Sequence, residues 1–490
     1  MIDSDFTPVL VGMATAMRRD DDFRQALEPL DLMVQVAHAA GIDSGSAEIL
    51  GSLEHISVPA GRWKYANPAG EIARAVGAPK AFQVLSSVGV LQQTLIGDAC
   101  ARIARGEVRC AMVVGADTGY RLLRARISGE APHERTQNDA PDLHLRPAQE
   151  LRHTVELRSG MQMPVGLYAI LESALRAREG LSVSDHRDRI AALYARFTDT
   201  AAANPHATLT QALSAIDIRN ASARNPMQAF PYTRHHCSDW NVDQAGALLL
   251  CSNAHARSLG IPEDRWVYPV VSTESNHMVA VSARKHLAEC PGARITGQAA
   301  LAYAGLQITD VDLVDLYSCF PLAVQHFAKA VGLNIEAPLT LTGGMAFAGG
   351  PYNNYVLQST CRAIELMRMG RGRNALLSCV SGVVTKQAFA LWSMDPPQQP
   401  FASLDLSATV AKESPALEIV EHFRGMAVVA GCTVLHARDK ESQGVVLADT
   451  PDGRRAMATT SDPAFVRALE SEEMVGRRVH IEGAMLLPST

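Results

Sequence analysis

The chain has 490 residues, 47% of them hydrophobic and 20% charged, so it can bury large cores and is not expected to be disordered. Its 45 basic and 51 acidic residues give a net charge of −6, which argues against a nucleic-acid partner. No run reaches the roughly 18 apolar residues of a membrane span, and the acidic residues 1–6 do not resemble a secretory signal. We therefore expect a cytoplasmic protein with no membrane contact.

The first part of the chain alternates strands with helices. Strands are predicted over 9–12, 81–84 and 110–115, and helices over 30–40, 72–76 and 94–104. Continuous apolar runs between helices are typical of a parallel sheet covered on both faces. Residues 120–224 differ: charged residues, His and Gln dominate their first part, and two helices follow near 165–178 and 185–203. We interpret this stretch as an insertion, after which a strand over 245–251 resumes the sheet.

A second α/β unit begins near Trp266. Its predicted strands span 267–272, 311–317, 375–380 and 385–392, and its predicted helices span 295–304, 322–331 and 356–369. Each half of the chain contains a glycine-containing loop, a helix and an apolar strand that ends in small residues. This shared order would place two helix N-termini at one central cleft.

The prolines within 394–400 mark a linker, since stacked prolines interrupt helix and sheet. About 90 residues follow, with short strands predicted over 426–435, 443–447, 454–458 and 478–482. Asp452-Gly453 is a hairpin-turn signal. A small all-β barrel of the OB type is predicted here.

The nine cysteines are scattered, and none forms a Cys-x-x-Cys pair. Neither a disulfide framework nor a zinc site is therefore expected, and most cysteines should be small buried hydrophobes. The run His235-His236-Cys237 does not change this expectation, because adjacent residues rarely ligate one ion well. We predict no metal and no cofactor.

Glycines gather in residues 343–354, which include Gly343-Gly344 and Gly349-Gly-Pro-Tyr-Asn-Asn354. Such a loop lets the backbone approach a ligand and presents amide N–H groups at the start of a helix. A tight turn between packed elements is the alternative. The loop is not a P-loop, because no Gly-Lys-Ser or Gly-Lys-Thr follows it.

Residues 315–321, Asp-Leu-Tyr-Ser-Cys-Phe-Pro, end a predicted strand. Strand ends of open α/β sheets face the crevice where ligands bind, so Tyr317, Ser318 and Cys319 could contact a substrate. The alternative is a plain turn in which Ser318 caps a helix and Cys319 joins the core. We expect Asp315 on the solvent side or in the turn.

These motifs carry a resemblance. The chain resembles the thiolase superfamily, specifically type 1 thiolase-like proteins with an additional C-terminal domain, over nearly its full length. The motifs lie at 225–232, 242–247, 315–321, 343–355 and 385–387. The resemblance implies an α/β, five-layered αβαβα thiolase fold with an inserted loop domain and an OB-like C-terminal domain. The implied domains are 1–119 with 225–252 (N-terminal half), 120–224 (loop domain), 253–394 (C-terminal half) and 401–490 (OB-like domain).

Thiolases make or break a carbon–carbon bond in acyl-CoA thioesters, using a nucleophilic cysteine, a Gly-His-Pro histidine and a second cysteine as acid and base. On this sequence the nucleophile position falls at Gly89 and the histidine position at Gly350, while the second cysteine is matched by Cys379. Losing either missing group costs several powers of ten in rate. The resemblance therefore implies an acyl-CoA-binding protein without ordinary thiolase activity.

Two other functions stay open. One is a retro-aldolase, or another lyase or acyltransferase, acting on a β-hydroxyacyl-CoA; the other is a non-catalytic scaffold. The catalytic candidates are Tyr317, Ser318, Tyr352 and Cys379. Cys379 is a candidate because a thiol near helix N-termini can have a lowered pKa. The substrate-binding candidates are Gly89, Val90, Cys319, Gly349, Gly350 and Asn353.

The expected partners are CoA or an acyl-CoA and a second copy of the chain. In the thiolase fold an edge strand pairs across a two-fold axis, and residues 109–114 are apolar enough to be buried at such an interface or beside it. We therefore predict a homodimer.

Overall fold

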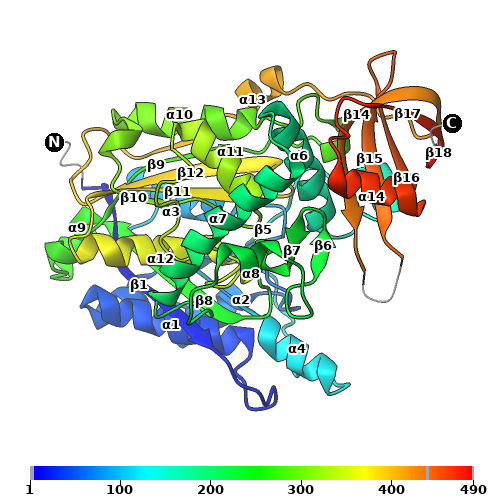
Figure 1. Cartoon of the computed structure of the whole chain (residues 1–490). Helices are drawn as coiled ribbons and strands as arrows, with labels where there is room; N and C mark the ends of the chain where they lie inside the picture. Colours follow the sequence, from blue (N-terminus) through cyan, green and yellow to red (C-terminus); the bar gives the residue numbers. More distant parts are fainter. Residues whose placement is uncertain (1–4, 438–440, 488–490) are drawn as a thin grey trace.

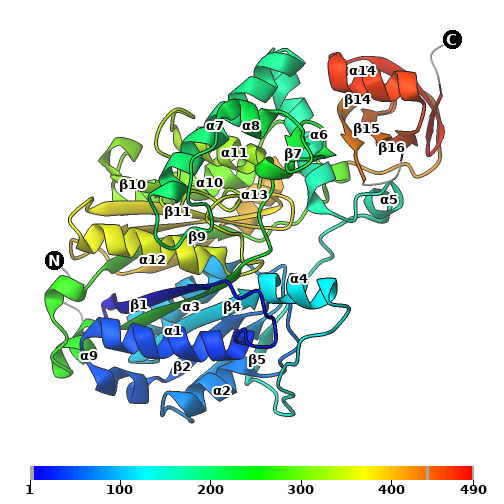
Figure 2. The same cartoon turned by 60° about the horizontal axis from the view of Figure 1, so that its bottom comes forward.

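The computed structural model describes residues 5–437 and 441–487 (Figure 1). Its main body is a stack of helical layers and two sheets, from which a smaller C-terminal unit projects (Figure 2). No helix within the described residues combines the length and apolar character needed to cross a bilayer.

The first sheet has the strand order β1-β8-β4-β2-β3-β5. Its strands are β1 (Pro8–Arg18), β2 (His55–Pro59), β3 (Phe82–Ser86), β4 (Cys110–Thr118), β5 (Leu143–Leu145) and β8 (Asp243–Ser252). β2 runs parallel to β3 and β4, but β8 runs antiparallel to β1 and β4. The predicted parallel sheet is therefore a mixed sheet, because the strand that follows the insertion enters it from the opposite direction.

The second sheet has the strand order β10-β11-β12-β9-β13. Its strands are β9 (Tyr268–Ser275), β10 (Leu313–Asp315), β11 (Asn374–Ser381), β12 (Lys386–Ser393) and β13 (Ala402–Asp405). β13 pairs in parallel with β9, so the chain completes this sheet after the proline-rich linker. The boundary predicted at residue 401 therefore lies too early.

Helices separate and cover the two sheets (Figure 2). α3 (Gln92–Ala104) and α12 (Tyr355–Arg368) lie between the sheets; α1 (Pro29–Ser44) and α2 (Pro68–Ala75) cover the first sheet, and α10 (Pro291–Ala304) and α11 (Pro321–Val331) cover the second. Helices packed on two sides are buried on most of their surface, which is why the apolar runs at 94–104 and 356–369 predicted them. The five-layered thiolase-like architecture is confirmed.

The inserted segment adds helices beside these layers. They are α4 (Gly119–Ile127), α5 (Thr154–Arg158), α6 (Pro164–Arg178), α7 (Val183–Ala202) and α8 (Ala215–Arg219), followed by the short strands β6 (Met227–Ala229) and β7 (Tyr232–Thr233). α6 and α7 pack against α11, so the loop domain lies on the second half of the core.

The C-terminal domain is a five-stranded barrel, as predicted. Its elements are α13 (Ser407–Glu413), β14 (Phe423–Leu435), β15 (Gln443–Asp449), β16 (Arg455–Thr460), α14 (Pro463–Ser471), β17 (Arg478–Gly483) and β18 (Met485–Leu487). The order β15-β16-β18-β17-β14 closes because β15 also pairs with β14. β6 extends this sheet through the pair Ala229–Leu435, and α6 packs on β14, so the barrel is joined to the loop domain.

The strand expected at a dimer interface is not an edge strand. Residues 110–114 lie in β4, whose two neighbours are β2 and β8. The edge of β3 is occupied by β5, which pairs Val84 with Leu143 and Ser86 with Leu145. Residues 110–114 therefore do not form an edge strand that could pair across a two-fold axis, and the homodimer itself stays a prediction.

Candidate functional site

A cavity of about 150 Å³ lies where the loop domain meets the ends of the second sheet and the starts of α3 and α12. It is lined by Val88, Pro164, Tyr168, Ser238, Trp240, Tyr317, Cys319, Phe320, Met345, Tyr352, Asn353, Val380, Ser381 and Gly382. We call it the inner cavity. Four of the predicted site residues, Tyr317, Cys319, Tyr352 and Asn353, line it. Tyr317 and Cys319 precede α11, whereas Tyr352 and Asn353 lie in the glycine-rich loop that comes before α12, and folding brings them to one place.

Asp315 holds the glycine-rich loop in position. Its carboxylate accepts hydrogen bonds from the Leu341 N–H at 2.8 Å, the Thr340 hydroxyl at 3.1 Å and the Tyr355 hydroxyl at 3.0 Å. Burial raises the pKa of Asp315 to about 6, although these hydrogen bonds oppose the shift. Asp315 is buried, so the expectation of a solvent-side or turn position was wrong. Its carboxylate is the acceptor for buried donors of the glycine-rich loop, which would otherwise be unpaired.

Tyr317 and Cys319 present their side chains to the inner cavity. The Tyr317 ring meets the Tyr355 ring nearly perpendicularly, with centroids 5.5 Å apart. Burial raises the pKa of Tyr317 well above its ordinary value. The Cys319 thiol is hydrogen-bonded to the Tyr168 hydroxyl at 3.2 Å, and burial raises its pKa to about 12. Both groups therefore stay protonated near neutral pH.

Ser318 does not line the inner cavity, and its role as a catalytic residue stays a prediction. Its side chain is fully buried, and its Oγ accepts a hydrogen bond from the Met345 N–H at 3.0 Å. Ser318 therefore holds the glycine-rich loop.

Cys379 is also outside the cavity lining, and only 1% of it is exposed. Burial raises the pKa of its thiol to about 12, although the N–H groups of Gln93 and Gln92 at the start of α3 act in the opposite direction. The predicted lowered pKa was wrong, because complete desolvation outweighs the two helix amides.

The chain itself covers the position matched to the nucleophile. Gly89 has φ +102°, and a Cβ atom there would lie 2.9 Å from Cγ of Pro147 and 3.5 Å from Leu151. Its carbonyl accepts a hydrogen bond from the buried Lys386 Nζ at 2.8 Å. Gly89 and its neighbour Val90 do not line the inner cavity, and their contact with substrate stays a prediction.

Gly349 and Gly350 lie in the glycine-rich loop but outside the lining of the inner cavity. Gly349 lines a separate cavity of about 260 Å³ between β1, α12 and the loop domain, and the Gly350 N–H donates to the Asp239 carbonyl at 2.9 Å. Their role as substrate-binding residues stays a prediction. Tyr352, two residues after Gly350, has φ +36°, a left-handed conformation that is strained for a side chain of this size.

A larger cavity of about 800 Å³, which we call the outer cavity, adjoins the inner one. The two share four lining residues: Pro164, Ser238, Trp240 and Phe320. Arg19, Arg62, Arg126 and Arg234 also line the outer cavity, together with a single carboxylate among the described residues, that of Asp239. Sequence reasoning missed this group, because its arginines come from four segments that only the fold brings together.

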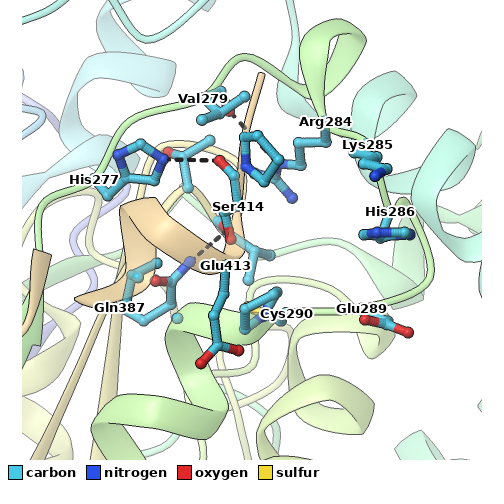
Figure 3. A pocket seen from close by; sticks show the side chains of 16 residues that line it. His277, Val279, Arg284, Lys285, His286, Glu289, Cys290, Gln387, Glu413 and Ser414 are labelled. Atoms are coloured by element: carbon cyan, nitrogen blue, oxygen red, sulfur yellow. Dashed lines mark hydrogen bonds between the residues drawn. The ribbon is translucent and has the colours of Figure 1, made fainter. Parts of the chain in front are cut away.

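A third space, of about 50 Å³, lies behind the turn that follows β11 (Figure 3). Val384 and Thr385 of this turn line it, whereas Ser381 and Gly382 line the inner cavity. Val384 has φ +47°, a strained conformation for a β-branched residue. Figure 3 shows His277, whose Nε2 bonds the Ser414 carbonyl at 3.1 Å, on one side of this space and His286 on the other. The described residues hold no group of three or more metal-ligating side chains.

Known proteins resemble this chain in both sequence and fold. Residues 405–484 match the family model described as the thiolase-like protein type 1 additional C-terminal domain. Comparison with curated protein sequences returns no match.

Several solved structures share the fold. A monomeric SCP2-thiolase-like protein type 1 from Mycobacterium smegmatis aligns with a TM-score of 0.83 and 27% identity, over 99% of this chain and 100% of that one. The Ltp2–ChsH2(DUF35) aldolase aligns with a TM-score of 0.60 and 18% identity, over 80% and 98%. Human mitochondrial 3-ketoacyl-CoA thiolase aligns with a TM-score of 0.55 and 16% identity, over 80% of this chain and 99% of that one. The last two show the fold alone.

The layered sheets, the inserted loop domain and the fused barrel give this chain a thiolase-like fold. Its residues 405–484 match the additional C-terminal domain of type 1 thiolase-like proteins, and over nearly its full length the chain is similar to one protein of that type.

Proposed function

We propose that this protein binds acyl-CoA thioesters and does not transfer acyl groups covalently. The observation that supports this proposal is a pair of adjoining cavities, one small and one large, which share lining residues that include Phe320 and Trp240. The inner cavity of about 150 Å³ would hold the acyl group. The outer cavity of about 800 Å³ would hold the pantetheine and nucleotide portions of CoA.

The charge of the outer cavity supports this assignment. CoA carries three phosphate groups, and guanidinium groups are the side chains best suited to bind them. Four arginines line the outer cavity, and Arg62 also lies over the Tyr352 ring at 5.6 Å, at the junction with the inner cavity. A cytoplasmic location, where CoA esters are available, is part of the proposal.

The inner cavity offers no evident nucleophile. Among the described residues its lining contains one cysteine and no histidine. Burial raises the pKa of that cysteine, Cys319, to about 12, so its thiol stays protonated near neutral pH. Ordinary thiolase chemistry needs a thiolate here, and we therefore expect it to be absent.

Retro-aldol cleavage is the second candidate, because two of the three tyrosines that line the inner cavity, Tyr317 and Tyr352, suit its acid and base steps. A base, for which Tyr352 is the candidate, would take the β-hydroxyl proton of a β-hydroxyacyl-CoA. The Cα–Cβ bond would then break, its electrons would form the thioester enolate, and protonation of Cα would yield a shorter acyl-CoA and a carbonyl compound. Tyr317, kept protonated by burial, suits a hydrogen bond to the enolate oxygen.

Calorimetry with CoA, acetyl-CoA and β-hydroxyacyl-CoA esters tests binding, and chromatography of the same mixtures tests turnover. Arg234→Gln should weaken CoA affinity about tenfold through loss of a charge-assisted hydrogen bond. Arg224→Gln, which removes an exposed arginine outside the lining, is the control. Binding without turnover supports the main proposal, and cleavage of a β-hydroxyacyl-CoA supports the second. Absence of binding by every ester would leave a scaffold role and overturn both.

A further inference from the structure

A short chain of hydrogen bonds links the starts of α3 and α12 to the inner cavity. The Val356 N–H, in the first turn of α12, donates to Gln92 Oε1 at 2.8 Å. Gln92 Nε2 in turn donates to Asn353 Oδ1 at 3.4 Å. Gln92 is 3% exposed, so water does not compete for these groups.

This chain of bonds determines which way each amide faces. A backbone N–H can only donate, so Gln92 must turn its oxygen toward Val356 and its nitrogen toward Asn353. Asn353 must therefore turn its oxygen toward Gln92, which leaves Asn353 Nδ2 on the other side. In the part of the chain that the structure describes, this nitrogen is shielded from solvent and has no hydrogen-bond partner.

The unpartnered nitrogen belongs to a residue that lines the inner cavity. Asn353 shares that lining with Tyr317 and Tyr352 and with the apolar walls Phe320 and Val380. Buried amide donors in native proteins almost always have an acceptor, so an unpaired one beside a cavity indicates that a ligand supplies it. The amide donor is neutral and does not titrate. It can therefore bond an uncharged carbonyl oxygen, and this hydrogen bond does not depend on the pH.

We infer that Asn353 Nδ2 donates a hydrogen bond to the carbonyl oxygen of the bound thioester, and that Gln92 is the positioning residue that orients it. The inference rests on the proposed function, since it requires an acyl-CoA in the inner cavity. In the same geometry, the amide would stabilise negative charge that develops on that oxygen if the α-carbon loses a proton or a carbon–carbon bond breaks.

The first test compares a ligand that has the carbonyl with one that lacks it. For Asn353→Ala, the Kd of acetyl-CoA should rise about five- to tenfold, while the Kd of free CoA stays unchanged. Asn353→Asp is a second variant that keeps the side-chain shape and can still accept from Gln92, but loses the donor. It should show the same selective loss. Circular dichroism checks that each variant is folded.

The second test reads the hydrogen bond directly. Infrared spectroscopy of acetyl-CoA labelled with ¹³C at the carbonyl should show a lower stretching frequency when bound to the parent protein than when free. Asn353→Ala should return the frequency toward the free value. Gln92→Met should do so in part, because it releases the asparagine amide. Gln93→Met is the matched control: Gln93 is equally buried at the same helix start, but its Nε2 bonds Ser272 at 3.1 Å.

The outcomes of these tests distinguish a failure of this inference from a failure of the proposed acyl-CoA binding. If neither CoA nor acetyl-CoA binds the parent protein, the proposed function fails and the inference fails with it. If both bind, but the asparagine variants weaken both equally or leave the carbonyl frequency unchanged, only the inference is overturned. A shift with Gln93→Met as large as that with Gln92→Met would remove the positioning role of Gln92.

Discussion

A buried carboxylate in the loop domain gives the sharpest prediction about stability. Glu172 on α6 is completely buried, and Oε1 accepts hydrogen bonds from His186 Nε2 and Gln325 Nε2, both at 2.7 Å. Oε2 accepts one from the Tyr232 hydroxyl. The three donors belong to α7, α11 and β7, so this one side chain joins four elements.

Removing this carboxylate leaves its buried partners unpaired. Breaking a buried, charge-assisted network from one side costs about 3–5 kcal/mol, so we expect this loss for Glu172→Ala. Unfolding entropy near the midpoint is about 2.1 cal/mol/K per residue, or roughly 1 kcal/mol/K for 490 residues. If the chain unfolds as one unit, Tm should therefore fall by about 3–5 °C.

The same residue predicts a pH dependence. Burial alone would raise the pKa of Glu172, but hydrogen bonds from His186, Tyr232 and Gln325 outweigh it and hold the pKa below its ordinary value. Stability from a lowered carboxyl pKa is present above the unfolded value, about 4.3, and is lost as pH falls through the folded value. The Tm gap between the parent and Glu172→Gln should therefore be constant from pH 7 to 5 and narrow below about pH 4.

Differential scanning fluorimetry measures these changes. Glu421→Ala is the control, because Glu421 is a carboxylate that is also paired with a basic side chain, Arg158 at 2.5 Å, but on the surface, where such pairs contribute little. We expect its Tm within about 1 °C of the parent. Equal shifts for the two variants would refute the reasoning from burial, and a gap that widens in acid would refute the assigned pKa direction.

Three further predictions concern other parts of the molecule. Cys379 should resist alkylation in the folded protein at pH 8, since the pKa of its thiol is about 12, and Cys379→Ala should leave acyl-CoA affinity unchanged; rapid labelling followed by mass spectrometry would contradict this. Gly343→Ala should lower Tm by several degrees more than Gly305→Ala, because a Cβ at Gly343 would lie 2.4 Å from Cα of Ala201, whereas one at Gly305 meets nothing within 4 Å. Light scattering at micromolar concentration tests the predicted homodimer: because β5 occupies the edge of β3, a dimer would have to use another surface, and the mass of one chain would refute the prediction.

Local patterns in the sequence predicted the core of this fold well. Both central helices are buried over most of their length. Prolines that begin α10 and α11 and left-handed glycines that end them, Gly305 and Gly332, mark clear boundaries. The direction of β8 was not predictable in the same way. A buried strand has the same apolar pattern whichever way it runs, so residues 245–251 revealed a strand but not its antiparallel pairing.

The site was harder to predict than the fold, because its features depend on packing between distant segments. Strand ends and glycines pointed to Tyr317, Cys319, Tyr352 and Asn353, which do line the inner cavity. The covering of Gly89 by Pro147 could not be foreseen, since it depends on a contact made by the inserted segment. The pKa of Cys379 was misjudged for a related reason: the nearby helix start is visible in sequence, but complete burial is not.

The strand pair that joins the barrel to the loop domain has a consequence for biosynthesis. Ala229 pairs with Leu435, and the Phe230 N–H donates to the Val434 carbonyl at 2.9 Å. A ribosome adding about 5–20 residues per second needs roughly 10–40 s to make the intervening chain. Throughout that interval the β6–β7 hairpin and the face of α6 that packs on β14 are without their partner, and unpaired strand edges favour aggregation. The nascent protein therefore passes through a stage in which its loop domain depends on the last domain to be synthesised, and chaperone availability should affect its yield in cells.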